Sequence, residues 1–508
     1  MLLLLTGCQQ AASHKNKEIT MQALSDMKVP AFVLDAQTMK RQLRQLARND
    51  NAQTMADRQA RALYTDSVCP VFWIDGYGVD SRADSLLARL QQLEQVGFSP
   101  RSFYVEAISK DLQLLRQLQF DKTEGVSQIA ARLEYYLTKA CLRYAYGQRF
   151  GYINPQQVFN HLDVEKQDSS RRMVQYRGLF DIDMDLPTAS YAKTVVHKIQ
   201  TDSLSEYLSE IQPEGKYYEQ MKQMLSKVST DDERRRVLCN MERGRWRLHH
   251  PIPDDNSKHI VVNIPAFHLY AYQADSVLDM RIACGAITTK TPLLTSEMEW
   301  MEVNPEWVIP KSILETDVAR RAGDSAYFAR NRYQIFERAT NKQMEISEVS
   351  RAMLLSGKYR VAQKSGSDNS LGRIVFRFKN RFSVFLHYTS TPGVFKRDVR
   401  AVSHGCVRVA KPYELAEFVL DNPDPWLLDR IHISMGLGAL TDRGRQYLKA
   451  HSTDEDHKLI GYVPVKPHVP LYIIYNTLWP DETGAMQTWP DIYGYDRVIW
   501  QNLQPYMQ

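Results

Sequence analysis

The spacing of apolar residues changes once along this chain, and that change limits the fold classes open to it. Between residues 22 and about 200, apolar side chains recur at helical spacing, as in 84–96 and 131–146. From 258 to about 410 the alternation has period two, in the segments 259–264, 269–272, 280–284, 299–303, 373–378 and 382–387. We therefore expect an α+β chain, with a mainly helical N-terminal domain followed by a β-rich, β-sandwich-like domain.

The length of 508 residues is too great for a single core, so several domains are expected. We place a helical domain at 22–240, which includes two further helices at 217–228 and 231–238. A β-rich domain follows at 258–430, and a C-terminal extension at 431–508 is expected to pack on it. A charged, helix-compatible segment at about 314–360 interrupts the strands, and an insertion of that size beside a site is often a lid.

The N-terminus is apolar and ends in a cysteine. Leu5-Thr6-Gly7-Cys8 resembles a bacterial lipobox, in which the cysteine becomes the lipid-modified first residue of the mature protein. The segment has no basic n-region and is short for an export signal, so the true start could lie upstream. We expect residues 1–21 to be a lipoprotein signal and tether, and the protein to be held in the periplasm of a Gram-negative bacterium by the outer or inner membrane. A chance apolar N-terminus is the alternative.

Charge and cysteine content exclude several functional classes. The net charge of +5 is spread along the chain, which suits an anionic partner such as cell-wall polymer and does not form a nucleic-acid footprint. No cofactor motif and no metal-ligand cluster is present in the sequence, so neither group is expected. Four scattered cysteines lack CxxC or zinc spacing and are expected to be buried free thiols, with one long-range disulfide left open: Cys69, Cys141, Cys239 and Cys284.

The segment Ser403-His404-Gly405-Cys406-Val407 carries the strongest chemical signal. A cysteine beside glycine and histidine can be a nucleophile, because glycine permits close backbone approach and an imidazole can take the thiol proton. His387 ends a strand-like run 16 residues before Ser403, and we favour it as the base for Cys406. His404 is the rival base. The alternative is a structural cysteine beside two hydrogen-bonded histidines.

Two further requirements of acyl transfer can be assigned to nearby residues. Backbone N–H groups around Gly405 and Cys406 are the natural donors for an oxyanion. Arg408 is the nearest fixed positive charge and could anchor a substrate carboxylate, while an ordinary ion pair is an equally good reading of it.

His387, the gap and Ser403-His404-Gly405-Cys406 together resemble the catalytic signature of the L,D-transpeptidase (YkuD-type) family. The N-terminal helical segment resembles the scaffold domain of the long, YcbB-like subgroup, and the similarity covers most of residues 70–500. Further stretches occur in the order found in that subgroup: 240–246, 262–265, 291–292, 304–307, 310, 369–373, 403–409, 469–475 and 491–496.

The resemblance implies a peptidoglycan cross-linking enzyme whose partners are stem peptides. Cys406 would attack the bond after the L-centre of the third stem residue, commonly diaminopimelate, release the terminal D-Ala and form a thioester. A side-chain amine of a second stem would then resolve the thioester as a 3→3 cross-link. His387 would accept and donate the proton, and a backbone carbonyl near Ser403 and His404 would orient it. Members of the family are typically acylated by carbapenems.

The chain departs from the subgroup after the strand that carries the base. Relatives usually read Tyr-Leu-His-Asp-Thr-Pro, whereas this chain reads Phe385-Leu386-His387-Tyr388-Thr389-Ser390-Thr391-Pro392. The tyrosine hydroxyl and the aspartate that this chain lacks would bear on how the acceptor is positioned and on contacts with the lid. Tyr388 is assigned to substrate binding. Two rival functions stay open: an L,D-carboxypeptidase, in which water resolves the thioester, and a catalytically inactive wall-binding lipoprotein. The oligomeric state is left open.

Overall fold

The computed structural model describes residues 23, 26, 28–66, 68–75, 77–120, 123–168, 173–255, 257–453 and 457–507. The predicted signal and tether, with Cys8, lie outside the described residues. The chain divides into two compact units. We call residues 1–154, 185–247 and 499–508 the helical unit, and residues 155–184 and 248–498 the sheet unit.

This division differs from the predicted domain boundaries. Residues 155–184 group with the sheet unit, where β5 (Phe180–Asp181) pairs with β9 (Leu293–Val303). Residues 499–508 group with the helical unit, where the ring of Tyr506 lies 4.6 Å from that of Tyr152. The segment 431–508 is therefore not one peripheral extension, since β18 (Tyr462–Ile474) is a strand of the main sheet, between β6 and β9.

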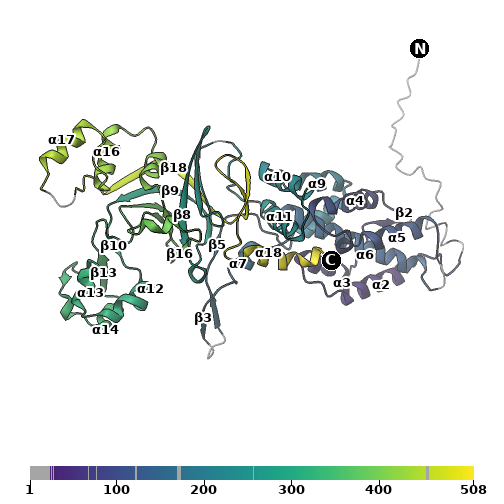
Figure 1. The fold of residues 1–508 in the computed structure, drawn as a ribbon. Helices are drawn as coiled ribbons and strands as arrows, with labels where there is room; N and C mark the ends of the chain where they lie inside the picture. The colour runs from purple at the N-terminus through teal and green to yellow at the C-terminus, as the bar shows by residue number, and fades with distance from the viewer. Residues whose placement is uncertain are drawn as a thin grey trace, which may run out of the picture. The chain divides into compact units, whose positions relative to one another are not determined.

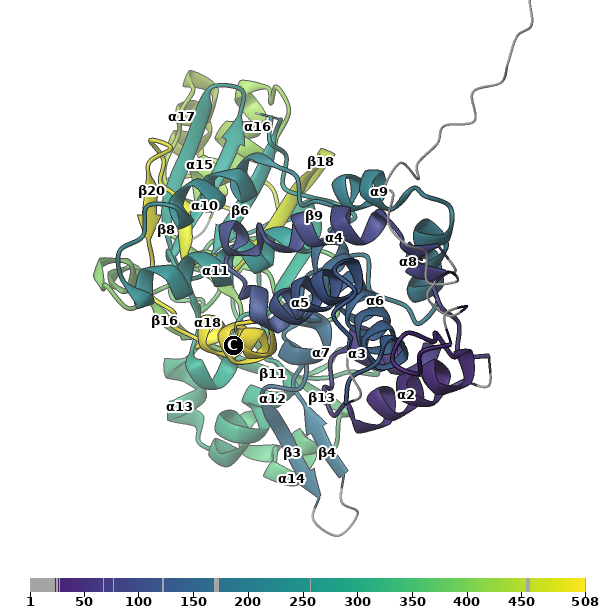
Figure 2. The same ribbon diagram turned by 90° about the vertical axis from the view of Figure 1, so that its right-hand side faces the viewer.

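The long helix α6 (Val126–Phe150) is the centre of the helical unit, and its neighbours surround it in Figure 2. Its side chains are buried on almost every face, which agrees with the predicted apolar stripe at 131–146. Buried Arg143 on α6 donates from Nε to Asp57 over 2.6 Å. Around it lie α2 (Ala36–Asn49), α3 (Met55–Thr65), α4 (Arg82–Leu90), α5 (Val105–Arg116), α8 (Tyr191–Gln200), α9 (Leu204–Glu210), α10 (Lys216–Leu225) and α11 (Asp231–Arg245).

The helix predicted at 84–96 is broken in two. It consists of α4 and a separate 3₁₀ turn, Leu93–Val96, which ends at Gly97 with a φ of +90°. A left-handed residue at a helix end is usually glycine, because a β-carbon there is strained. Among the described residues, no helix has both the length and the apolar character that a membrane crossing requires.

The main strands of the sheet unit pair in a closed circuit, part of which is visible in Figure 1. The α+β class is confirmed, and the circuit closes because β9 pairs with both β18 and β14. In spatial order the circuit contains β14 (Ile374–Phe378), β15 (Leu386–His387), β17 (Val407–Val409), β8 (Ser276–Gly285), β7 (His268–Gln273), β6 (His259–Asn263), β18 and β9.

Shorter elements complete the sheet unit. Strand β16 (Ala401–Ser403) pairs in parallel with β8. The others are α7 (Pro155–Phe159), β3 (Val164–Asp168), β4 (Met173–Tyr176), α15 (Pro412–Val419), α16 (Pro425–Ser434), α17 (Asp442–Ala450), β19 (Leu478–Pro480), β20 (Met486–Thr488) and the first turn of α18 (Tyr495–Leu503).

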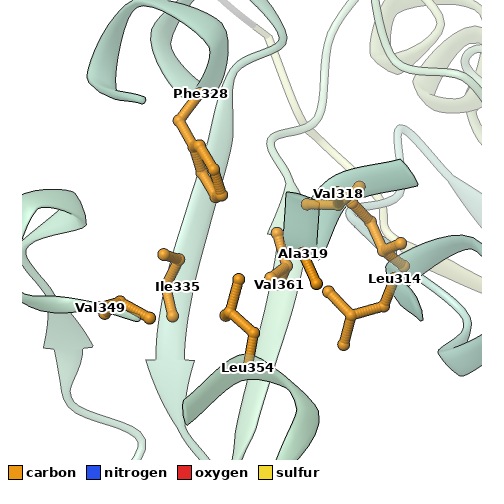
Figure 3. Packing of buried hydrophobic residues seen from close by; sticks show 9 residues of the cluster. Leu314, Val318, Ala319, Phe328, Ile335, Val349, Leu354 and Val361 are labelled. Carbon is orange, nitrogen blue, oxygen red and sulfur yellow. The ribbon is translucent and has the colours of Figure 1, made fainter. Parts of the chain in front are cut away.

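The insertion between β9 and β14 has a core of its own, shown in Figure 3. The prediction of a helix-compatible segment is corrected here, because a four-stranded sheet runs through it in the order β10 (Trp307–Val308), β13 (Tyr359–Gln363), β11 (Tyr333–Glu337) and β12 (Gln343–Met344). Short helices pack beside that sheet: α12 (Lys311–Ile313), α13 (Ser325–Arg330) and α14 (Arg351–Leu355). The buried residues include Leu314, Val318, Ala319, Phe328, Ile335, Val349, Leu354 and Val361. Because this core is separate, the insertion forms a small packed body within the sheet unit.

Candidate active site

Two short parallel strands bring the predicted nucleophile and base to one side of the sheet. In the β15–β17 pair, Leu386 lies opposite Val407 and His387 lies opposite Arg408. The N–H of Val407 donates to the Phe385 carbonyl over 3.1 Å, so the pairing continues toward Cys406. Leu386 and Val407 are fully buried on one face. Since successive side chains alternate across a strand, His387, Arg408 and Cys406 belong to the opposite face.

A hydroxyl inside the loop shapes the turn before the nucleophile. The Oγ of Ser403 donates to the Cys406 carbonyl over 2.6 Å and accepts from the Gly405 N–H at 3.1 Å. Gly405 has a φ of +119°, a conformation that side chains rarely tolerate. The Gly405 N–H, predicted as an oxyanion donor, is therefore engaged by Ser403. Of the two predicted donors, the N–H of Cys406 is the one with no partner among the described residues.

Two threonines anchor the same loop to β8, and the sequence motifs did not reveal this role. The Oγ1 of buried Thr291 donates to the Gly405 carbonyl and accepts from the Gly285 N–H, each over 2.8 Å. The Oγ1 of Thr289 donates to the Ser403 carbonyl over 2.8 Å. The hydroxyl of Tyr493 donates to the Gly285 carbonyl over 2.5 Å, which ties the C-terminal segment to this turn. In the sequence, the only indication of these contacts is that residues 291–292 and 491–496 belong to the stretches that resemble the YcbB-like subgroup.

His387 is buried, and its surroundings keep it neutral. Burial lowers the pKa of His387 to about 3, and the positive charge of Arg408 adds to that effect. Hydrogen bonds with backbone groups of Leu371 and Tyr388 act to raise the pKa of His387, and burial outweighs them. The Ser403 carbonyl, expected to orient this ring, already accepts from the Ala286 N–H at 2.9 Å and from Thr289. The backbone groups that act on the imidazole are those of Leu371 and Tyr388, and its Nδ1 has no hydrogen-bond partner among the described residues.

The turn 369–372 explains how Leu371 comes to lie near the imidazole. The Oδ1 of buried Asn369 accepts from the Leu371 N–H at 2.8 Å, and its Nδ2 donates to the Pro305 carbonyl over 3.2 Å. Gly372 has a φ of +67°, and a β-carbon on it would lie 2.7 Å from the Thr389 nitrogen. Glycine is therefore required where this turn packs against the end of β15.

Cys406 is half-buried and forms no disulfide. Burial raises the pKa of the Cys406 thiol to about 11, which outweighs the lowering by the Phe385 N–H, Arg377 and Arg408. The thiol form of Cys406 is therefore favoured at neutral pH. A neutral thiol faces a site whose imidazole is also neutral, so the proton must pass to His387 as the sulfur attacks.

The other predicted residues lie around this pair. His404 is exposed, whereas Arg408 is half-buried. Tyr388 packs against the small apolar cluster of Ala283, Val394 and Phe395. Cys69, Cys141 and Cys284 are buried free thiols, as predicted, and Cys239 is buried too. Within the described part of the chain, no cluster of three or more His, Cys, Asp or Glu side chains could hold a metal ion.

Comparison with known proteins agrees with this arrangement. Residues 257–437 match the L,D-transpeptidase catalytic domain, YkuD, and residues 58–225 match the scaffold domain. This chain carries an L,D-transpeptidase catalytic domain and an N-terminal scaffold domain. A Haemophilus influenzae protein named "Putative L,D-transpeptidase" is 27% identical over 330 residues, which are 63% of this chain and 62% of that relative. The chain thus aligns with less than two thirds of the relative's length.

A groove of about 810 Å³ opens on the transpeptidase domain, and its lining includes Phe385, the residue that precedes β15. Phe385 links the two, because its ring lines the groove while its backbone accepts from Val407. The ring of Phe385 also lies 5.6 Å from that of His387. The groove is lined by Trp300, Glu302, Pro310, Arg377, Phe378, Lys379, Asn380, Arg381, Ser383, Val384 and Phe385.

Replacing Thr291 with valine tests the anchoring of the catalytic loop. Thr291→Val keeps the shape but leaves the Gly285 N–H and the Gly405 carbonyl without their buried partner. We expect the free energy of unfolding to fall by about 1–3 kcal/mol in a urea titration, with slower acylation of Cys406. Thr288→Val, at an exposed neighbour in the same turn, is the matched control and should leave both unchanged. Equal values for the two variants would contradict the anchoring role.

The alkylation of Cys406 tests its raised pKa. Because the thiolate fraction rises with pH up to the pKa, the rate of iodoacetamide alkylation should still be climbing between about pH 9 and about pH 10. A small thiol with a pKa of about 8.5 levels off over that range and serves as the control. The rate is read from the mass of the peptide that contains Cys406. A plateau already reached near pH 7 would show a thiolate stabilised at rest.

Proposed function

We propose that this protein is a peptidoglycan L,D-transpeptidase that forms 3→3 cross-links through a thioester on Cys406. The observation that carries the proposal is the placement of a half-exposed cysteine on the same face as a neutral, strand-borne histidine, within an L,D-transpeptidase catalytic domain. The substrate class follows from the domain family, whose reaction joins peptidoglycan stem peptides.

Acylation uses the neutral pair directly. The Cys406 sulfur attacks the carbonyl carbon of the third stem residue while its proton passes to His387. The Cys406 N–H is the backbone donor available to the resulting oxyanion. His387, now protonated in surroundings that strongly disfavour its charge, returns the proton to the amine of D-Ala as the C–N bond breaks. The product of this half-reaction is the thioester.

Deacylation separates the proposed function from its rival. In a transpeptidase, the side-chain amine of a second stem attacks the thioester and becomes an amide. In an L,D-carboxypeptidase, water attacks the same carbon and a tripeptide is released. The groove that includes Phe385 favours the transferase, since about 810 Å³ is room for a second peptide segment on the domain that carries Cys406.

Incubation with a disaccharide-tetrapeptide tests this proposal by mass spectrometry. The wild-type protein should release D-Ala, form a cross-linked dimer and gain the mass of meropenem when treated with that carbapenem. Cys406→Ala should abolish all three, and His387→Gln should slow acylation by about 10²–10⁴-fold. Cys141→Ala, which removes another buried thiol, should retain them. Tripeptide as the sole product would favour the carboxypeptidase, and no reaction at all would favour an inactive wall-binding protein.

The same proposal includes attachment to the envelope through lipidated Cys8, which would hold the enzyme in the periplasm beside its substrate. The support is the lipobox-like Leu5-Thr6-Gly7-Cys8. In a Gram-negative host, metabolic labelling with a fatty-acid analogue should mark the wild-type chain and leave Cys8→Ala unmarked and soluble after lysis. Equal labelling of both chains would remove this part of the proposal.

A further inference from the structure

A row of side chains runs across the strands from the nucleophile into the groove. Val375 pairs with His387, and Phe376 with Leu386, so the next residue, Arg377, comes opposite Phe385. On its other side Arg377 pairs with Trp300 of β9. By the register of β15 and β17, Phe385 in turn lies opposite Cys406. Neighbouring strands are about 4.8 Å apart, so Arg377 starts about 10 Å from the nucleophile and on the same face.

The guanidinium of Arg377 is held over the ring that separates it from Cys406. It lies 4.4 Å from the centroid of Phe385. Its Nε and Nη2 donate to the two carboxylate oxygens of Glu302 over 3.1 and 3.0 Å. Glu302 thereby occupies the Nε–Nη2 edge of the planar guanidinium of Arg377. The remaining nitrogen, Nη1, has no hydrogen-bond partner among the residues that the structure describes. Both side chains are about a third exposed, and Nη1 is the nitrogen of Arg377 left for a ligand.

The charge of the groove selects the sign of that ligand. Three cationic side chains, Arg377, Lys379 and Arg381, line it. Lys379 pairs with Glu299 and Arg381 with Asp181. Arg377 pairs with Glu302 and keeps Nη1 for a ligand. An arginine that is stacked on an aromatic ring and oriented by a carboxylate is well suited to bind a second carboxylate. The guanidinium that would bind this carboxylate lies over Phe385, the residue that comes opposite Cys406 in the strand register.

We propose that Arg377 binds the carboxylate of the acceptor's amino-acid centre and so places the neighbouring amine at the thioester. This inference rests on the proposed function. An amine and a carboxylate on one carbon, as at the D-centre of diaminopimelate, can meet the sulfur-bound carbonyl and Arg377 together. The amine nitrogen then forms a C–N bond with the thioester carbonyl carbon, the C–S bond breaks, and the proton lost by the amine reaches the sulfur through His387.

The consequence is a preference among acceptors. An acceptor stem with diaminopimelate carries the carboxylate next to its amine, whereas a stem with lysine offers the amine alone. A charge-assisted hydrogen bond contributes about 1.5–3 kcal/mol, which corresponds to about 10–100-fold in affinity. The preference should therefore appear in the KM for the acceptor. The first half-reaction does not involve the acceptor, and it should change only as far as the charge of Arg377 influences the pKa of Cys406.

The experiment compares two acceptors that differ only in this carboxylate, with one donor tetrapeptide. For the wild-type protein we expect the KM of the diaminopimelate stem to be at least about tenfold lower than that of the lysine stem. Arg377→Gln should bring the two KM values together, and Arg377→Lys should restore part of the difference. Arg445→Gln, which removes the guanidinium that pairs with Asp442 on α17, is the matched control and should keep the preference.

The rate of D-Ala release and the mass of the acyl-enzyme are measured alongside. Changes in these values for Arg377→Gln that are smaller than the change in the acceptor KM support the acceptor role. Equal KM values in the wild type, or a preference that survives Arg377→Gln, would overturn it. So would a loss of acylation as large as the loss of cross-linking, because Arg377 would then serve the nucleophile. If the wild type forms no acyl-enzyme with any donor, the proposed function itself falls, and this inference falls with it.

Discussion

The parallel pairing of β15 with β17 is the constraint on which the site depends. Only two residues of β15 take part in this pairing, yet it places His387 opposite Arg408. By the same register, Cys406 comes opposite Phe385. So short a pairing does not hold itself in place, because few hydrogen bonds offset the entropy of ordering the chain. Its neighbours supply the missing rigidity: β14 and β8 flank it, and Thr291 anchors the loop that enters β17.

Electrostatics in the site is decided by burial. Two arginines, Arg377 and Arg408, and the Phe385 N–H all favour a thiolate on Cys406, yet the cost of burying the charge is larger and raises its pKa. For His387, burial and the same arginines act together and lower its pKa. The result is a neutral thiol beside a neutral base. An entering substrate can alter this balance, because a carboxylate at either arginine would weaken its pull on the sulfur.

Several parts of the fold could be predicted from local pattern, and others could not. The apolar stripe at 131–146 predicts α6, and the period-two runs predict β6, β7, β8, β9 and β14. In the insertion, β10 and β12 are only two residues long, too short for an alternating pattern to predict them. β11 has five residues but lies in a segment rich in charged side chains, which read as helix-compatible. β18 reads as a tail in the sequence, with three prolines in Tyr462–Ile474, but pairing with β6 and β9 makes it part of the circuit. Such pairing depends on partners about two hundred residues away, which local sequence does not encode.

The sequence by itself determined which residues are candidates for the chemistry, because a cysteine within Ser403-His404-Gly405-Cys406 and a strand-end histidine are local features with local signals. It also determined the change from helical to strand periodicity and hence the fold class. Only the tertiary structure decided which groups hold that chemistry in place. Thr289, Thr291, Leu371, Tyr493 and Arg377 act through contacts made across the sheet. The physical reason is that hydrogen bonding, burial and the pKa of a side chain depend on neighbours in space, whereas the type of chemical group belongs to the residue itself.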